Sequence, residues 1–335
     1  MNTLNAIIIG FGNIGYYYSL DKKRKKTWSH FEAFQKMKNV NLFGIVDKSK
    51  IKRDFIKKKF PKLKVYKSID EVLMAKKKID LFSICTPTET HYEMLVKLIN
   101  YKSKIIICEK PLCSKIGDAK KILNLSKNSR SIIAVNYQRR FEKNFIIAKN
   151  IIKKGVLGKI KFINACYTRK ILNIGTHIID IIRMIVSSEI SRTSSFFVER
   201  ALKKDPSLSG LIFFKNKVCC SLQSIGNKFK YIFEIEIFCE KGKIRISDNG
   251  KKIEIYKFIK SKNFTGYFEL KKIKFKSFDL SIKKLNDPMK ELIKNSIDAY
   301  LNNSKIYPNV YDGYQNLLVA KAMENSALKK KVIKL

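Results

Sequence analysis

The first 135 residues alternate short apolar runs with stretches whose apolar residues recur at helical spacing. Short β-branched runs between turn residues predict strands, whereas a period near 3.6 residues predicts amphipathic helices. Strands that alternate with helices form βαβ units and a parallel sheet, whose faces the helices cover. The predicted strands are 6–9, 42–46, 80–85, 105–108 and 132–135, and the predicted helices are 31–37, 50–60, 69–75, 92–99 and 116–125.

After Phe141 the pattern changes to a helical segment at 144–153, a glycine turn at 155–158 and then longer alternating segments. Alternation of apolar and polar residues predicts an antiparallel or mixed sheet with one exposed face, which a second copy often covers. The predicted strands are 159–167, 210–214, 218–224, 231–239, 243–246 and 252–258, and the predicted closing helices are 288–301 and 310–327, with Asp287 and Asn309 as caps.

A glycine-rich turn follows the first predicted strand directly, with the sequence Gly10-Phe11-Gly12-Asn13-Ile14-Gly15. In a strand–turn–helix context this GxGxxG spacing is typical of dinucleotide binding. The first glycine permits the tight turn, the second lets the backbone approach a diphosphate, and the third lets helix and strand pack closely. An ordinary glycine turn is the alternative interpretation.

The cofactor preference is predicted from Asp47, which ends the second strand. A carboxylate there accepts hydrogen bonds from the ribose 2′-hydroxyl and repels a 2′-phosphate, which favours NAD. Lys48, Lys50 and Arg53 lie close by and leave NADP open. Asp47 comes later than the usual spacing because residues 16–29 look like an insertion before the helix is completed.

We therefore predict an α/β protein with two domains, which the length of 335 residues allows. Residues 1–125 are expected to form a Rossmann dinucleotide-binding domain. Residues 126–335 are expected to form a substrate-binding and oligomerisation domain of α+β type with an open, mostly antiparallel sheet. The C-terminal helix is a candidate to pack back on the first domain.

The formal net charge of +42 would ordinarily suggest nucleic acid or an anionic membrane as a partner. The lysines are spread along the whole chain, however, and form no compact basic motif or aromatic platform. The densest cluster, Lys22–Lys26, is predicted to be a solvated loop, with attraction of an acidic substrate as the alternative. We expect no specific nucleic-acid partner.

Several other classes of protein are disfavoured by the sequence. The N-terminus lacks the features of a signal peptide, and the longest apolar candidate, 171–186, contains charged residues, so we expect a cytoplasmic protein without a membrane span. Seven cysteines without CxxC spacing are expected to be reduced thiols. Three separated histidines, without an HxxxH pair, predict no metal site.

Two polar segments follow strands 80–85 and 105–108, namely residues 85–91 (CTPTETH) and 108–112 (CEKPL). The carboxyl ends of strands are where an open α/β sheet places its ligand crevice. A helix-initiating turn and a surface ion pair before a proline are the respective structural alternatives.

The ordered segments GFGNIG, GIVD, CTPTETH, CEKPL, VNYQRRF, GVLGKI and NIGTHIIDIIRMI resemble the Gfo/Idh/MocA family over nearly the whole chain. The resemblance implies an NAD(P)-dependent oxidoreductase. It would transfer hydride between nicotinamide and a hydroxyl or keto group of a sugar, polyol or nucleotide-linked sugar. It also implies a homodimer or homotetramer that uses the open sheet. A non-catalytic dinucleotide-binding sensor or regulatory protein of the same fold is the alternative.

The resemblance also implies roles for individual residues. Lys110 would hydrogen-bond the reacting hydroxyl and His177 would transfer its proton, roles that suit an ammonium and an imidazole. Without the resemblance, His177 is more simply a core histidine. Besides the glycine turn and Asp47, the cofactor would contact Thr86, Pro87, Thr88, His91, Glu109 and Lys110.

Substrate-binding residues are predicted around the histidine segment. Many family members carry aspartate four residues before the catalytic histidine, but this chain has Asn173, which can orient a hydroxyl but cannot titrate. This departure is the main support for the non-catalytic alternative. An arginine at the pocket could grip a carboxylate or phosphate, unless it serves in an ion pair. The remaining candidates are Arg139, Tyr167, Arg169 and Asp180.

Overall fold

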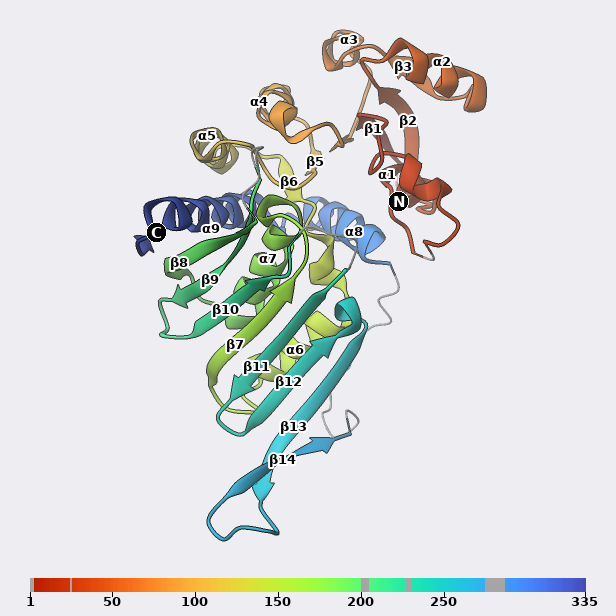
Figure 1. Cartoon of the computed structure of the whole chain (residues 1–335). Helices are drawn as coiled ribbons and strands as arrows, with labels where there is room; N and C mark the ends of the chain where they lie inside the picture. The colour runs from red at the N-terminus through yellow and green to blue at the C-terminus, as the bar shows by residue number, and fades with distance from the viewer. Residues whose placement is uncertain (1–2, 25, 200–204, 227–230, 275–286) are drawn as a thin grey trace. The chain divides into compact units, whose positions relative to one another are not determined.

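The structure is a computed structural model that describes residues 3–24, 26–199, 205–226, 231–274 and 287–335 (Figure 1). The chain divides into two compact units: unit 1 contains residues 1–141 and 286–315, and unit 2 contains residues 142–285 and 316–335. This division differs from the expected boundary at residue 125. The segment 126–141 belongs to unit 1 because it supplies the last strand of that unit's sheet.

Unit 1 is built around a six-stranded parallel sheet of order β3-β2-β1-β4-β5-β6. This is the strand order of the Rossmann fold, with its crevice between β1 and β4, where the order reverses. The predicted fold of this region is confirmed, and β3 is the one strand of the sheet that the sequence pattern missed. The strands are β1 (Leu4–Ile9), β2 (Val40–Val46), β3 (Lys64–Tyr66), β4 (Leu81–Ile84), β5 (Ile105–Cys108) and β6 (Ile132–Val135).

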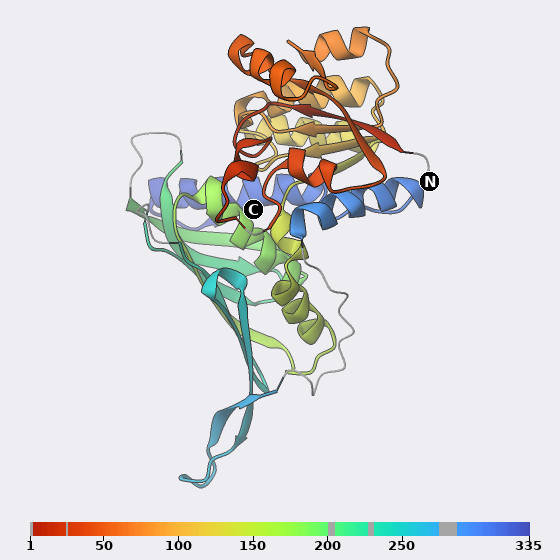
Figure 2. The same ribbon diagram turned by 90° about the vertical axis from the view of Figure 1, so that its right-hand side faces the viewer.

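Helices cover both faces of this sheet (Figure 2). The side chains of Ser29, Ser49 and Ser68 cap three of them, because each accepts the backbone N–H three residues on. The predicted caps Asp287 and Asn309 are confirmed by hydrogen bonds from the N–H groups of Lys290 and Asp312. The helices are α1 (His30–Gln35), α2 (Lys50–Lys59), α3 (Ile69–Met74), α4 (His91–Asn100), α5 (Ile116–Lys127) and α8 (Pro288–Leu301), with 3-10 turns η1 (Tyr17–Leu20), η2 (Thr88–Thr90) and η3 (Gln138–Phe141).

The chain leaves the glycine turn after Gly15, where the insertion was expected, and returns to it at His30. The N–H groups of His30 and Phe31 donate to the carbonyl oxygens of Ile14 and Gly15, both at 3.0 Å. These bonds hold the first turn of α1 directly against the glycine turn. The insertion therefore lengthens the chain between Gly15 and α1 without moving the helix away from the sheet.

Unit 2 contains a nine-stranded sheet of order β14-β13-β12-β11-β7-β10-β9-β8-β15, in which only β7 and β10 pair in parallel among the described strands. The predicted mostly antiparallel sheet is confirmed. Strands β8, β14 and β15 were not predicted. The strands are β7 (Ile160–Tyr167), β8 (Ile190–Glu199), β9 (Ser207–Phe214), β10 (Cys219–Ser224), β11 (Phe233–Cys239), β12 (Gly242–Ser247), β13 (Lys252–Lys260), β14 (Phe268–Ile273) and β15 (Ile333–Lys334).

One face of this sheet forms the core of unit 2 with its helices, whereas the other face carries exposed Phe162, Phe196 and Leu211. Helix α7 is preceded by a π-helical turn, η4, whose sequence includes Asn173. The helices are α6 (Lys143–Lys153), α7 (Thr176–Val186) and α9 (Val310–Lys329), with η4 (Ile171–Gly175) and the 3-10 turn η5 (Asp248–Gly250). The unit division falls within α9, after Gln315. Among the described helices, none has the length and apolar character needed to cross a membrane.

Candidate functional site

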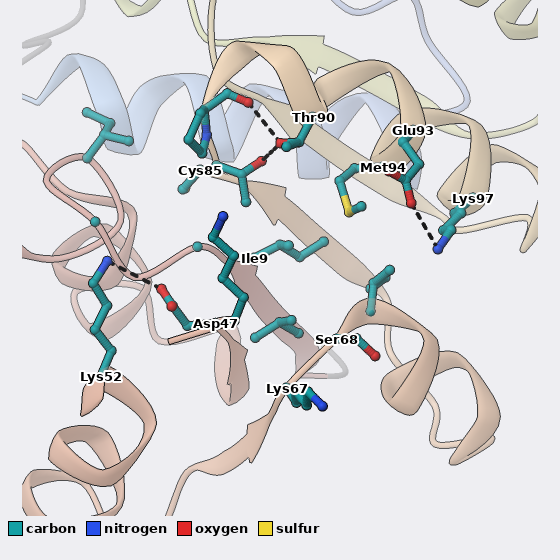
Figure 3. A pocket seen from close by; sticks show the side chains of 18 of the residues that line it. Ile9, Asp47, Lys52, Lys67, Ser68, Cys85, Thr90, Glu93, Met94 and Lys97 are labelled. Carbon is teal, nitrogen blue, oxygen red and sulfur yellow. Dashed lines mark hydrogen bonds and ion pairs between the residues drawn. The ribbon is translucent and has the colours of Figure 1, made fainter. Parts of the chain in front are cut away.

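A cavity of about 650 Å³ lies in unit 1 at the carboxyl ends of β1, β2 and β4 (Figure 3). Its wall combines the glycine turn, the end of β2, the start of α3 and the β4–α4 connection. The position is the crevice that an open parallel sheet offers at its switch point. The lining residues are Ile9, Gly10, Gly12, Asn13, Ile14, Tyr18, Val46, Asp47, Lys48, Lys52, Lys67, Ser68, Ile69, Asp70, Cys85, Thr86, Pro87, Thr90, Glu93, Met94 and Lys97.

The three glycines of the turn have three different surroundings. Gly10 has φ +98°, and an added Cβ would lie 2.9 Å from the Cys85 carbonyl carbon. An added Cβ on Gly15 would lie 2.2 Å from the Gly10 carbonyl oxygen, so this position is closed by the packing of the turn on itself. A Cβ on Gly12 would meet nothing within 4 Å, and Gly12 lines the cavity. The open space is therefore found at the glycine that was predicted to meet a diphosphate.

Asp47 stands at the rim of the cavity and is 7% exposed. Its Oδ2 accepts the Phe11 N–H at 2.8 Å and its Oδ1 accepts the Ser49 N–H at 2.9 Å. The Lys52 ammonium lies 3.6 Å from the same carboxylate, as Figure 3 shows. Asp47 thus ties the glycine turn to the end of β2 and brings negative charge to a wall that also contains Lys48 and Lys67.

Two residues of the glycine motif face away from the cavity. Phe11 is fully buried, and its ring stacks on Tyr16 with centroids 4.4 Å apart. Gly15 packs behind the turn, as its contact with Gly10 requires. Both had been predicted to bind the cofactor. They act on the shape of the turn, and neither forms part of the wall.

The β4–α4 connection places Thr86, Pro87 and Thr90 on the cavity wall. The Thr90 hydroxyl donates to the Thr86 Oγ1 at 2.6 Å or to the Pro87 carbonyl oxygen at 2.8 Å. These hydrogen bonds join the two ends of the β4–α4 connection. Thr88 and His91, predicted to contact cofactor, are absent from the wall. His91 is 1% exposed, with Nδ1 2.9 Å from the Pro111 carbonyl oxygen and Nε2 2.9 Å from the Thr86 carbonyl oxygen. It joins the connections that follow β4 and β5.

Glu109 and Lys110 follow β5 and lie outside the cavity wall. Glu109 is 9% exposed, and its Oε1 lies 2.9 Å from His30 Nε2 and accepts a bond from Asn136 Nδ2. Lys110 is half-buried. Burial raises the pKa of Glu109, but His30, Asn136 and the Lys110 charge together lower it. His30 was not predicted as a site residue, and no local motif marks it.

In unit 2 the predicted proton-transfer residue lies where a π-helical turn leads into α7. His177 lies in the first turn of α7 and is 8% exposed, and Asn173 lies in the preceding π-helical turn. Such turns occur often at functional sites. The ring of Tyr167 is close to Gly175, where a Cβ would lie 3.2 Å from its Cε2.

Two predicted substrate contacts, Tyr167 and Asp180, have their side chains in the core of unit 2. Tyr167 is fully buried and donates its hydroxyl to the Leu208 carbonyl oxygen at 2.8 Å. Asp180 is fully buried, and its Oδ1 accepts a bond of 2.7 Å from Asn316 Nδ2. Tyr167 supports the segment before His177, and Asp180 holds α7 against α9.

The predicted arginines have different environments. Arg139, in the turn after β6, is 7% exposed, whereas Arg169, after β7, is exposed with φ +70°. Arg140 forms a two-pronged ion pair with Asp312, at 3.1 and 2.8 Å. The ion-pair alternative therefore holds for Arg140. In the described part of the chain, no cluster of three His, Cys, Asp or Glu side chains is placed to hold a metal ion.

Residues 4–137 match the sequence family described as "Oxidoreductase family, NAD-binding Rossmann fold", GFO_IDH_MocA. This segment of the chain is similar to the Gfo/Idh/MocA oxidoreductase family. An oxidoreductase of Schizosaccharomyces pombe is 38% identical over 101 residues, which cover 30% of this chain and 27% of that protein. Myo-inositol 2-dehydrogenase of Thermotoga maritima is 24% identical over 269 residues, covering 74% of this chain and 76% of that enzyme.

Solved structures of similar fold cover the whole chain. Levoglucosan dehydrogenase, in complex with NADH and L-sorbose, superposes with a TM-score of 0.81 at 18% identity, covering 100% of this chain and 99% of that one. The apo scyllo-inositol dehydrogenase of Lactobacillus casei superposes with a TM-score of 0.77 at 17% identity, covering 99% and 98%. At these identities the likeness establishes the fold of the chain.

Proposed function

We propose that the protein is an NAD-dependent oxidoreductase that transfers hydride between nicotinamide and a CH–OH group of a sugar or polyol. The observation that carries the proposal is the cavity whose wall joins the open Gly12 to the Asp47 carboxylate. An open backbone position suits a diphosphate, and a carboxylate at the end of β2 suits a ribose diol. The named activities of myo-inositol 2-dehydrogenase and levoglucosan dehydrogenase support a sugar or polyol substrate.

The cofactor residues that we propose are those on the wall, namely Gly10, Gly12, Asn13, Ile14, Asp47, Thr86 and Pro87. Asp47 favours NAD because its charge repels a 2′-phosphate. Lys48, Lys52 and Lys67 line the same cavity, so we expect NADP to bind measurably but more weakly.

NAD, when bound, supplies the hydride acceptor. The chain must supply the groups that handle the hydroxyl and its proton. We propose that the Lys110 ammonium hydrogen-bonds the hydroxyl oxygen and stabilises the negative charge that develops there. His177 takes the hydroxyl proton, and Asn173 positions the substrate through hydrogen bonds without titrating. Arg139 and Arg169 are the proposed contacts for any carboxylate or phosphate on the substrate.

We also propose that the protein forms a homodimer or homotetramer through the sheet of unit 2. The exposed apolar side chains Phe162, Phe196 and Leu211 lie on its strands β7, β8 and β9. Apolar side chains gathered on an open sheet face are typical of surfaces that another subunit covers.

The test uses the variants Lys110→Ala and His177→Ala with a panel of inositols, free aldoses and nucleoside-diphosphate sugars. Loss of a proton-transfer group costs about 10²–10⁴-fold in rate, so turnover should fall by at least that factor while calorimetric NAD affinity stays within about twofold. The control is Lys120→Ala, which removes an exposed lysine from α5. If the unaltered protein binds NAD yet forms no NADH with any substrate, a non-catalytic dinucleotide-binding role replaces the proposal.

A further inference from the structure

His30 is a fully buried histidine for which the proposed chemistry has no use. It begins α1, where the chain returns from the insertion. Its Nδ1 lies 2.6 Å from Ser83 Oγ, and its Nε2 lies 2.9 Å from Glu109 Oε1. Because one ring nitrogen has a partner on β4 and the other has a partner directly after β5, the orientation of the imidazole is fixed.

Glu109 is the residue that His30 holds. Its Oε1 accepts from His30 and from Asn136 Nδ2, so contacts from α1 and from the end of β6 meet at one carboxylate oxygen. A buried carboxylate is costly unless it is paired and hydrogen-bonded. The next residue is Lys110, whose charge also lowers the pKa of Glu109. Both His30 and Lys110 therefore favour the ionised form of the Glu109 carboxylate.

The groups around His30 keep it protonated at neutral pH. Burial alone lowers the pKa of His30, but Cys85 after β4 and Glu109 after β5 raise it to about 10. Helix α8 brings the uncharged Met289 thioether to this cluster, 3.5 Å from Asn136 Nδ2. The ring of Phe34, on the same helix as His30, lies 6.4 Å away and carries no charge. The hydrogen bond from His30 to Glu109 is thus charge-assisted, the stronger kind.

We propose that His30 is a positioning residue: its hydrogen bond fixes the Glu109 carboxylate and thereby the backbone from which Lys110 reaches the substrate. The inference rests on the proposed function, which assigns Lys110 to the reacting hydroxyl. A displacement of about 1 Å at a reacting group can cost about 10²-fold in rate. Residue 30 therefore acts through Glu109 and does not touch substrate.

Two conservative variants separate positioning from packing. The amide nitrogen of Gln can occupy the place of Nε2 and still donate to Glu109, whereas Asn reaches only the place of Nδ1 beside Ser83. His30→Gln should lower kcat less than about tenfold and His30→Asn about 10- to 100-fold, with the NAD dissociation constant unchanged within twofold. The acidic limb of the pH–rate profile should move to higher pH in both, because Glu109 loses the cation that lowers its pKa.

Phe34→Leu is the matched control, since it loosens the same helix without removing a charge and should leave kcat and the pH profile unchanged. The double variant His30→Asn with Glu109→Gln should be no slower than Glu109→Gln alone, because both changes remove one interaction. Equal kcat values for His30→Gln, His30→Asn and the unaltered protein would overturn the proposal, as would additive losses in the double variant.

Nitrogen-15 NMR of the imidazole gives a measurement that needs no substrate. We expect His30 to show two protonated ring nitrogens at pH 7.5 and a changed Nε2 chemical shift in Glu109→Gln, where a neutral amide replaces the carboxylate. If that signature is present but the unaltered protein oxidises no sugar, the proposed function fails and the catalytic role of His30 fails with it. If the enzyme turns over and the signature is missing, the positioning role alone fails.

Discussion

Replacing Gly12 with alanine should separate cofactor binding from folding. A Cβ at Gly12 meets no atom within 4 Å, and the backbone there is outside the left-handed region, so the variant can fold without strain. Restricting the unfolded chain should raise the free energy of unfolding by about 0.4–1 kcal/mol. The methyl group projects into space needed for a diphosphate, so the NAD dissociation constant should rise at least about tenfold, or about 1.4 kcal/mol.

Gly15→Ala should behave in the opposite way. Its Cβ would lie 2.2 Å from the Gly10 carbonyl oxygen, far inside the 3.4 Å at which ordinary contact begins. Relieving such an overlap typically costs about 1–3 kcal/mol of stability. Gly117→Ala, in α5 and outside the cavity, is the control, because its Cβ also meets nothing within 4 Å.

Urea unfolding and calorimetric titration with NAD test all three variants. Gly117→Ala should gain about 0.5–1 kcal/mol, since glycine is unfavourable inside a helix, and should bind NAD normally. If Gly12→Ala folds and binds NAD as tightly as the unaltered protein does, the dinucleotide does not pass over this turn. The assignment of the cavity would then be wrong.

Three further predictions concern charge. Asp47→Ser should raise the NAD dissociation constant about tenfold, because the ribose loses its hydrogen-bond acceptor. The ratio of the NADP to the NAD dissociation constant should fall, because the carboxylate no longer repels a 2′-phosphate. Titration of the variant with each cofactor measures both effects. The stability contribution of His30, whose pKa is raised to about 10, should be fully present below pH 6.5 and disappear as pH rises to about 10. The difference in unfolding free energy between the unaltered protein and His30→Gln should therefore shrink across that range; a constant difference would contradict the ion pair. Arg140→Ala removes the two-pronged ion pair from the buried Asp312 and should cost about 3–5 kcal/mol of stability by denaturant titration. Lys97→Ala, which breaks only exposed ion pairs, should cost less than about 1 kcal/mol.

Several elements were predicted from the sequence to the residue. The strands 105–108 and 132–135 and the helix 288–301 have the predicted bounds, because short apolar runs and a proline after a capping aspartate are strong local signals. Strand β3 was missed because three residues without a buried side chain show no period. Strand β8 was missed because its burial pattern does not alternate regularly.

The candidate site was predicted only in part. The positions of Gly10 and Gly12 follow from the spacing of the motif, whereas Ser68 and Met94 join the cavity wall only through the packing of α3 and α4. A sequence motif also includes residues whose side chains lie in the core and not in the cavity. Phe11 lies between two glycines of the turn, yet its ring belongs to the core.

The amino-acid sequence by itself determined most of the strands and helices, the glycine turn and the carboxylate after β2, because each depends on residues close together in the chain. Only the tertiary structure decided that His30 pairs with Glu109, 79 residues away, and that Tyr167 and Asp180 point into the core of unit 2. The physical reason is that hydrophobic periodicity reports which side of an element is buried. It carries no information on which distant side chain meets that side, since this depends on how separate elements pack.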